Sequence, residues 1–348
     1  MLDQRVKLAR EACRLTQREL SERSGVSPSV IANIELGRTT VLPEESIVAI
    51  ANVTGFPQAF FYLFEPPDMP DGYFRKKSNG RAKEERQVIA FVRLLVEFIR
   101  YAETVVTMPD TTYDIILERD KHVDLNVAEN AAEQARDRLG IGRLDPIMNL
   151  TRAIERAGII VARLPLISEQ YESYSYWPDF GANTRPIIVV VPGMPGDRLR
   201  ASLAHEIAHL SLHTLRRGTD PKTAETEAWL FAGALLLPYD ALISDLEGNR
   251  PTLSFLSAIK GKYGVSMAFA ARRLRDSEII SQDFYVSLMK QLSTRGWRKN
   301  EPGVVVSETP LLLPKITAAL TGDTDVLMQR DLLSSISSTS LIQVPSWG

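Results

Sequence analysis

The sequence has little that would build a disulfide, a membrane span or a polycationic surface. Cys13 is the only cysteine in 348 residues, so no internal disulfide can form, which fits a reducing cytoplasm. No apolar run approaches the roughly 20 residues of a membrane span, and no signal peptide is evident at the start. The net charge of -2 means that nucleic-acid binding requires a local surface. We expect a cytoplasmic protein with no membrane partner.

Changes in composition predict a mostly helical α+β chain, with an all-α domain followed by a domain that contains a small sheet. A Pro/Gly-rich stretch after residue 64 marks the first boundary. The predicted segments are a helical domain 1–64, a basic linker 65–83, a helical connector 84–145, a sheet-containing domain 146–295 and a C-terminal extension 296–348.

Periodicity gives the expected elements of the second half. A segment rich in aromatic and turn-forming residues, 171–180, is predicted to lie outside the strands. The expected helices are 147–157, 197–215 and 222–237, with further helices within 251–295, and the expected strands are 159–162 and 186–192.

Three of the four histidines fall within one predicted helix, at positions 205, 209 and 213. Side chains four residues apart share a helix face, so His205 and His209 can bind one metal ion. Glu206 can accept a proton from water whose pKa zinc lowers to about 7, and can pass that proton to a leaving amine. The pattern is that of a zinc peptidase helix, and the apolar residues around it indicate a buried helix rather than a chance match on a surface.

A catalytic zinc ion needs a third protein ligand and an open fourth position. The next predicted helix offers Glu225 and Glu227, which lie about 200° apart around a helix, so only one of them can face the metal. Apolar residues occupy both faces of this helix, so spacing chooses only weakly between the two. Three ligands along one straight helix would span about 12 Å. We therefore expect a supporting role for His213.

The segment AHEIAHLSLH at 204–213, followed by ETEA at 225–228 and FAGALLLP at 231–238, resembles the ImmA/IrrE-type metallopeptidases. The resemblance covers roughly 146–245 and implies a zincin-like domain. It implies that His205, His209 and Glu225 hold Zn²⁺ and that Glu206 is the general base. It also implies an endopeptidase of narrow specificity that cleaves a helix-turn-helix repressor after a stress or DNA signal.

Residues 16–27 are typical of a helix, a tight turn and the start of a second helix. Thr16 can cap the first helix, and Glu19 completes a capping box. Gly25 suits a left-handed turn residue between the helices. Ser27 can cap the second helix, with Pro28 at its first position.

The same segment resembles the XRE-type helix-turn-helix family over about 5–62, because Thr-Gln at 16–17, Gly-Val-Ser at 25–27 and Ile-Glu-x-Gly-Arg at 34–38 fall in register. The resemblance implies binding to a double-stranded DNA operator, with the helix 28–36 in the major groove. The residues expected at the DNA are Gln17, Ser27, Ser29, Asn33 and Arg38.

The charge of the helical domain leaves an alternative open. Residues 1–64 carry as many acidic as basic side chains, so a monomer would bind DNA weakly. We expect a homodimer, or help from the basic block 75–86. The alternative is a helical module for protein contacts.

Two tyrosines, Tyr174 and Tyr176, precede the second strand. They could line a substrate cleft, where a tyrosine can stabilise an oxyanion, although an ordinary aromatic core explains them more simply.

Together the two halves predict a DNA-binding transcriptional regulator whose zinc endopeptidase domain cleaves a repressor or antitoxin, the chain itself being one candidate, in a stress or mobile-element response. The alternative is a transcription factor whose peptidase-like domain is a non-proteolytic sensor of a ligand or metal. The intact Glu206 favours the peptidase, because a metal sensor needs no base beside the metal.

Overall fold

A computed structural model of the chain describes residues 2–64, 66, 73–74, 82–114, 117, 122–163, 173–177, 185–214, 219–248 and 250–322. Most of the predicted basic linker lies outside these residues. The chain divides into two compact units. Unit 1 comprises 1–108, 163–172 and 314–348, and unit 2 comprises 109–162 and 173–313.

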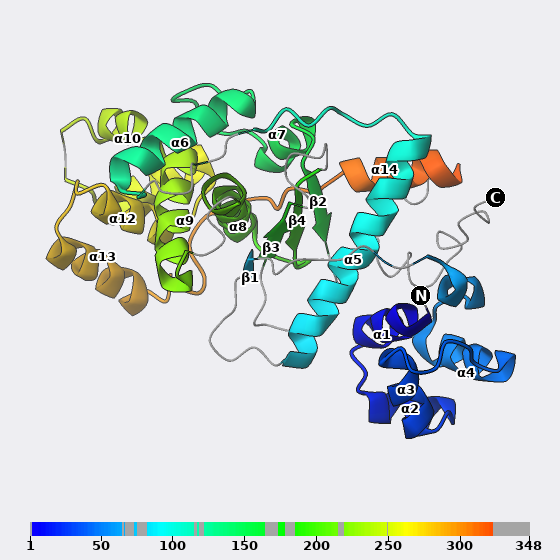
Figure 1. The fold of residues 1–348 in the computed structure, drawn as a ribbon. Coiled ribbons are helices and arrows are strands. Elements are labelled where there is room, and N and C mark those ends of the chain that lie inside the picture. Colours follow the sequence, from blue (N-terminus) through cyan, green and yellow to red (C-terminus); the bar gives the residue numbers. More distant parts are fainter. Residues whose placement is uncertain are drawn as a thin grey trace. The chain divides into compact units, whose positions relative to one another are not determined.

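Unit 1 is helical apart from one short strand, and its N-terminal helices are drawn in blue in Figure 1. Its elements are α1 (Leu2–Ala12), α2 (Gln17–Ser24), α3 (Pro28–Glu35), α4 (Glu44–Thr54), the 3-10 helix η1 (Gln58–Tyr62), β1 (Tyr73–Phe74) and α5 (Ala82–Val105).

Local capping defines α2, α3 and the turn between them, as the sequence predicts. The Thr16 side chain accepts a hydrogen bond from Glu19 N, and the Glu19 side chain accepts one from Thr16 N, which completes the capping box. Gly25 ends α2 with φ of 73°, in the left-handed region where a side chain is strained. Ser27 caps α3 and Pro28 occupies its first turn. The helix-turn-helix is therefore built by its own sequence.

A buried ion pair joins the first helix of this domain to the third. Arg10 Nε lies 2.5 Å from Glu35 Oε1, and its Nη2 lies 2.7 Å from Glu35 Oε2, a two-pronged contact. Gln17 Nε2 donates to the same Oε2 over 2.8 Å. Glu35 thus connects α1, α2 and α3 and fixes the angle at which α3 presents its outer face.

The long helix α5 packs against α1 within unit 1. Arg5 reaches Glu97 of α5 over 2.6 Å, and Gln87 donates to Ala12 O. Lys83 lies 2.7 Å from Glu19 Oε2, and its hydrogen bond lowers the pKa of Glu19 to about 2. The helix-turn-helix therefore rests on α5 through contacts along most of the length of that helix.

Unit 2 is a helical body around a small sheet (Figure 1). This confirms the mostly helical α+β class expected from the sequence. Its elements are α6 (Leu125–Arg138), α7 (Leu150–Arg156), β2 (Ile160–Arg163), β3 (Ser173–Tyr176), β4 (Ile187–Val190), α8 (Gly196–Ala208), the π-helical turn η2 (His209–His213), α9 (Pro221–Leu236), α10 (Tyr239–Leu246), α11 (Leu253–Tyr263), α12 (Met267–Asp276) and α13 (Gln282–Thr294). Helix α14 (Leu312–Thr321) begins at the end of unit 2, and its residues from Pro314 onward belong to unit 1.

The sheet corrects one sequence expectation. Strand β4 lies between β2 and β3, and β3 pairs with it antiparallel, with Ser173 opposite Val190 and Tyr176 opposite Ile187. The sequence analysis placed this segment outside the strands because it is rich in aromatic and turn-forming residues. Ser173 to Tyr176 nevertheless form β3, and all four residues are buried.

Two helix boundaries also differ from those that the periodicity of the sequence predicts. Helix α7 begins at Leu150 rather than 147, because the Asn149 side chain caps it by accepting from Arg152 N. The predicted helix 197–215 is α-helical only to Ala208 and continues as η2. Hydroxyl groups of Ser211 and Thr214 donate to backbone carbonyls four residues earlier, in and beside that wider turn.

The segment that follows α13 is bound to the rest of unit 2 through the buried carboxylate of Glu308. Glu308 accepts from Leu150 N and Thr151 N at the start of α7 and lies 3.0 Å from Arg200 Nη1 of α8. Gly196, at the start of α8, packs so closely on this segment that a Cβ there would lie 2.4 Å from Val306 O. The segment therefore belongs to the packed body of unit 2.

Among the described residues, no single helix is long and apolar enough to cross a membrane. Helices α9 and α10 pass the same test of length and composition only when taken together, and they are bent by 58° at the break between them.

We predict that Glu308→Ala lowers the free energy of unfolding of unit 2 by about 3 kcal/mol, because it leaves a buried guanidinium and two backbone N–H groups without their carboxylate. Urea unfolding followed by tryptophan fluorescence measures this, since Trp177, Trp229 and Trp297 all belong to unit 2. Thr309→Ala, at the exposed neighbouring position, is the control and should unfold like the parent chain. Equal midpoints for the two variants would contradict the assigned role of Glu308.

Candidate metal centre

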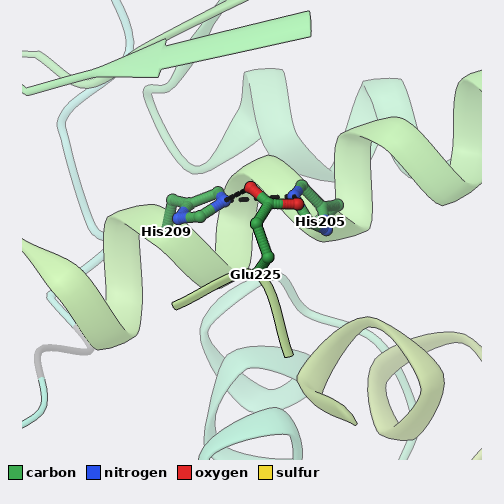
Figure 2. Close-up of side chains that lie close together, drawn as sticks. All are labelled: His205, His209 and Glu225. Atoms are coloured by element: carbon green, nitrogen blue, oxygen red, sulfur yellow. Dashed lines mark hydrogen bonds and ion pairs between the residues drawn. The ribbon is translucent and has the colours of Figure 1, made fainter. Parts of the chain in front are cut away.

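Two adjacent helices of unit 2 supply the site. Helix α8 is buried, and it packs against β3, β4 and α9. His205 stands near its C-terminal end and His209 begins η2, so the two imidazoles lie on the same face one turn apart. Glu225 lies in the second turn of α9 and points at them. Figure 2 shows its carboxylate between the two rings.

The distances among these three side chains suit a tetrahedral metal ion. His205 Nε2 and His209 Nε2 are 3.0 Å apart, and each lies 3.5 Å from a different oxygen of Glu225. A tetrahedral zinc ion with bonds of about 2.0–2.1 Å holds neighbouring ligand atoms about 3.3 Å apart. Two imidazoles and one carboxylate are also a usual donor set for catalytic zinc. The three side chains therefore fit Zn²⁺ in chemistry and in spacing.

The protonation of this cluster also suits a metal. Burial lowers the pKa of His205 below its ordinary value, against the smaller upward effect of its hydrogen bond with Glu225. Burial raises the pKa of Glu225, but the hydrogen bonds from His205 and His209 outweigh it and hold that pKa well below the usual range. A neutral imidazole and an ionised carboxylate are the forms that bind metal ions.

Glu206, the expected general base, is held by a residue that the sequence did not point to. Ser173 Oγ, at the start of β3, donates to Glu206 Oε1 over 2.6 Å, and both side chains are buried. Glu206 Oε2 is buried and has no hydrogen-bond partner among the described residues. One oxygen of this carboxylate is therefore fixed, and the other is left to accept a proton. Because the segment around Ser173 was predicted to be turns, no signal in the sequence pointed to this serine.

An aromatic ring supports His205. The Trp229 ring, one turn after Glu225 on α9, lies 4.6 Å from the His205 ring between centroids. Arg272 of α12 stacks on the same indole at 4.9 Å. Trp229 therefore restricts the rotation of His205. The spacing of four residues from Glu225 was the available sequence signal for it.

The remaining sequence candidates are not members of the ligand cluster. His213 does not face Glu225 but lies 3.0 Å from Glu227 Oε2, so the two glutamates of α9 face different histidines. Tyr174 and Tyr176 are both buried in β3, as an aromatic core predicts, and neither belongs to the three-residue cluster.

The five residues expected at the DNA are distributed around α3. Ser29 and Arg38 are exposed and Asn33 is half-buried, so all three are on or next to the outer side of the domain. Ser27 is exposed, but it also caps α3 and lies 3.1 Å from Ser29 Oγ. The amide nitrogen of Gln17 is already bound to Glu35.

Comparison with known families agrees with both parts of this description. Residues 154–275 match the family model of the IrrE N-terminal-like domain, peptidase family M78, and residues 4–59 match that of a helix-turn-helix domain. A search of curated proteins found no match. The chain thus joins a helix-turn-helix domain of the kind that binds DNA to a peptidase-like domain, an arrangement that supports a regulator. More specifically, the chain combines a helix-turn-helix with an ImmA/IrrE-type domain, as both resemblances predicted.

We predict that the chain binds one Zn²⁺ and that Glu225→Ala weakens zinc binding by more than about 100-fold, beyond the 10- to 100-fold typical of changes outside the ligand set. Competition with a chromophoric chelator gives the affinity, and elemental analysis after dialysis gives the stoichiometry. Lys222→Ala, on the exposed side of the same helix, should bind zinc like the parent chain. Retention of parental affinity by Glu225→Ala would remove Glu225 from the ligand set.

Proposed function

We propose that this protein is a transcriptional regulator whose second domain is a zinc-dependent endopeptidase that cleaves a helix-turn-helix repressor or antitoxin protein, with the chain itself among the candidate substrates. The convergence of His205, His209 and Glu225 beside the oriented carboxylate of Glu206 is the observation that carries the proposal. A site that only sensed a metal would need the three ligands but no fixed carboxylate next to them.

The residues divide the chemistry between them. His205, His209 and Glu225 would hold the zinc ion, which when bound supplies Lewis acidity at the scissile carbonyl and to an attacking water. The free Oε2 of Glu206 would accept the proton of that water and later deliver it to the leaving amine. Ser173 would keep this oxygen directed at the reacting atoms, because it holds the other oxygen of the same carboxylate.

The family resemblance supplies the class of substrate. The resemblance to ImmA/IrrE-type peptidases implies a helix-turn-helix repressor as the substrate, and this chain carries a helix-turn-helix domain itself. Repressor proteins encoded next to this one, and the chain's own domain, are therefore the first substrates to test. A stress or mobile-element signal would be the trigger, and a cytoplasmic site of action follows from the DNA target.

We predict that Glu206→Gln abolishes cleavage of such a repressor, with a loss of roughly 10²- to 10⁴-fold, the usual contribution of a general acid-base group. The amide keeps the volume of the side chain but cannot accept the proton. Folding and zinc content should stay at parental levels, as circular dichroism and elemental analysis would show. The readout is the rate at which full-length repressor disappears on gels, with the cleavage position found by mass spectrometry.

Two comparisons make this test decisive. Ser173→Ala should lower turnover less than Glu206→Gln does, since it loosens the base without removing it. Cleavage by Glu206→Gln at the parental rate would contradict the mechanism. A zinc-loaded parent chain that cleaves no repressor under any inducing condition would favour the sensor function instead.

For the first domain we propose binding to a double-stranded DNA operator as a homodimer, through α3. Ser29, Asn33 and Arg38 have the exposure and chemistry to contact bases and phosphates. The pairing of Gln17 with Glu35 favours a positioning role, in which Gln17 offers only its carbonyl oxygen outward. A dimer would double the few basic contacts that one neutral domain can make.

We predict that Asn33→Ala and Arg38→Ala weaken DNA binding in different ways. Asn33→Ala should lower discrimination at one base position by about 1–3 kcal/mol, whereas Arg38→Ala should weaken binding to all sequences and reduce the salt slope by about 1. The operator is first selected from random DNA with the full-length protein, and affinities are then measured at several salt concentrations. Identical behaviour of both variants and the parent would favour the alternative of a protein-contact module.

A further inference from the structure

A chain of buried polar contacts leads away from the metal centre on the side of His209. His209 Nδ1 lies 2.9 Å from His213 Nδ1, and His213 Nε2 lies 3.0 Å from Glu227 Oε2. All three side chains are buried, with 0% of His213 and 3% of Glu227 exposed. These hydrogen bonds form a second connection between η2 and α9, in addition to the contact between Glu225 and His209.

We propose that His213 and Glu227 are positioning residues that fix the tautomer and the ring orientation of His209, so that its Nε2 lone pair faces the metal centre. The inference rests on the proposed zinc site, but it concerns how the ligand is held and not what the domain cleaves. Neither His213 nor Glu227 is proposed to bind the metal itself.

Donor and acceptor rules give the direction of each hydrogen bond. An ionised carboxylate only accepts hydrogen bonds, so His213 Nε2–H donates to Glu227 Oε2. A neutral His213 then has a bare Nδ1, which accepts a hydrogen bond from His209 Nδ1–H over 2.9 Å. With its proton on Nδ1, His209 carries a lone pair on Nε2, the atom that lies 3.5 Å from Glu225 Oε1. One carboxylate therefore selects the metal-binding form of a histidine two contacts away.

Burial makes this arrangement specific. A buried imidazole or carboxylate without a partner costs free energy, so the relay is stable only when each proton lies between its donor and acceptor. Ligating histidines commonly donate their second ring nitrogen to such a partner, which fixes the ring and raises its basicity. In this domain a second histidine stands between the ligand and the carboxylate.

The positions of the two glutamates explain why both are needed. Glu225 and Glu227 are two residues apart, so they leave α9 in different directions. Glu225 lies between the two ligand rings, while Glu227 reaches the last residue of η2. The π-helical turn begins at the ligand His209 and ends at the relay residue His213, which places both rings next to each other, 4.9 Å apart between centroids.

The first test reads the protons directly in the zinc-loaded, full-length protein. The chain has only four histidines, so long-range ¹⁵N–¹H spectra of ¹⁵N-histidine-labelled protein can be assigned with single variants. We expect the Nδ1–H tautomer at His209 and the Nε2–H tautomer at His213, with the exposed His122 as the internal reference. An Nε2–H tautomer at His209 would overturn the proposal.

The second test measures zinc affinity by chelator competition, together with the visible spectrum of the Co²⁺-substituted protein. His213→Phe removes the acceptor and should weaken zinc binding about 10- to 100-fold and change the Co²⁺ bands. His213→Asn retains a δ-position acceptor for His209 and should recover part of the affinity. Glu227→Gln should fall between the parent and His213→Phe, because its amide oxygen still accepts a hydrogen bond but carries no charge.

A matched control separates positioning from simple loss of stability. Glu155→Gln alters another buried carboxylate of unit 2, which accepts from Leu311 N and Leu312 N, so it should lower the unfolding midpoint and leave zinc affinity unchanged. Parental zinc affinity and Co²⁺ spectra in His213→Phe and Glu227→Gln would contradict the relay even if the parent chain is an active peptidase. Zinc binding without cleavage in the parent would contradict the proposed peptidase and leave these measurements valid.

Discussion

The packing of α8 against α9 is the contact on which the metal centre depends. It brings the carboxylate of Glu225 within 3.5 Å of two histidine nitrogens that belong to another helix. Burying such groups is costly unless they find partners, so the apolar contacts around them must hold the two helices at one separation. Those contacts come from one continuous core cluster, which includes Leu203 and Ile207 of α8 and Phe231 of α9. The ligand geometry is thus a property of the helix pair rather than of the His-Glu-x-x-His sequence alone.

The features that sequence predicted well are the local ones. The capping box of Thr16 and Glu19, the left-handed Gly25 and the pair of histidines on one face all follow from residues within one turn of each other. The choice between Glu225 and Glu227 did not follow from periodicity. Helix α9 packs against α6 on one side and α8 on another, so apolar residues are required on more than one face and no single polar stripe marks the site. The family resemblance, not the spacing, selected Glu225.

What the sequence could not indicate depends on residues far apart in the chain. Ser173 precedes Glu206 by 33 residues and reaches it only because β3 lies beside α8. Glu308 caps a helix that begins more than 150 residues earlier, and Glu155 returns the same kind of contact to Leu311 and Leu312. A capping residue next to its helix is visible in sequence, whereas one supplied from the far end of the domain is not. The matched family segment therefore ends before residues that the fold of unit 2 requires.

The two proposed histidine ligands, His205 and His209, are held by different physical means. His209 is fixed by hydrogen bonds that continue through His213 to Glu227, whereas His205 has its Nδ1 without a hydrogen-bond partner among the described residues and packs against Trp229. Hydrogen bonds specify both the orientation and the proton position of a ring, but packing specifies orientation alone. The orientation of His209, on η2, is therefore more tightly fixed than that of His205. His205 neighbours Glu206, the proposed base, in the sequence, so the more adjustable of the two proposed ligands lies on the side where a proton would move in the proposed reaction.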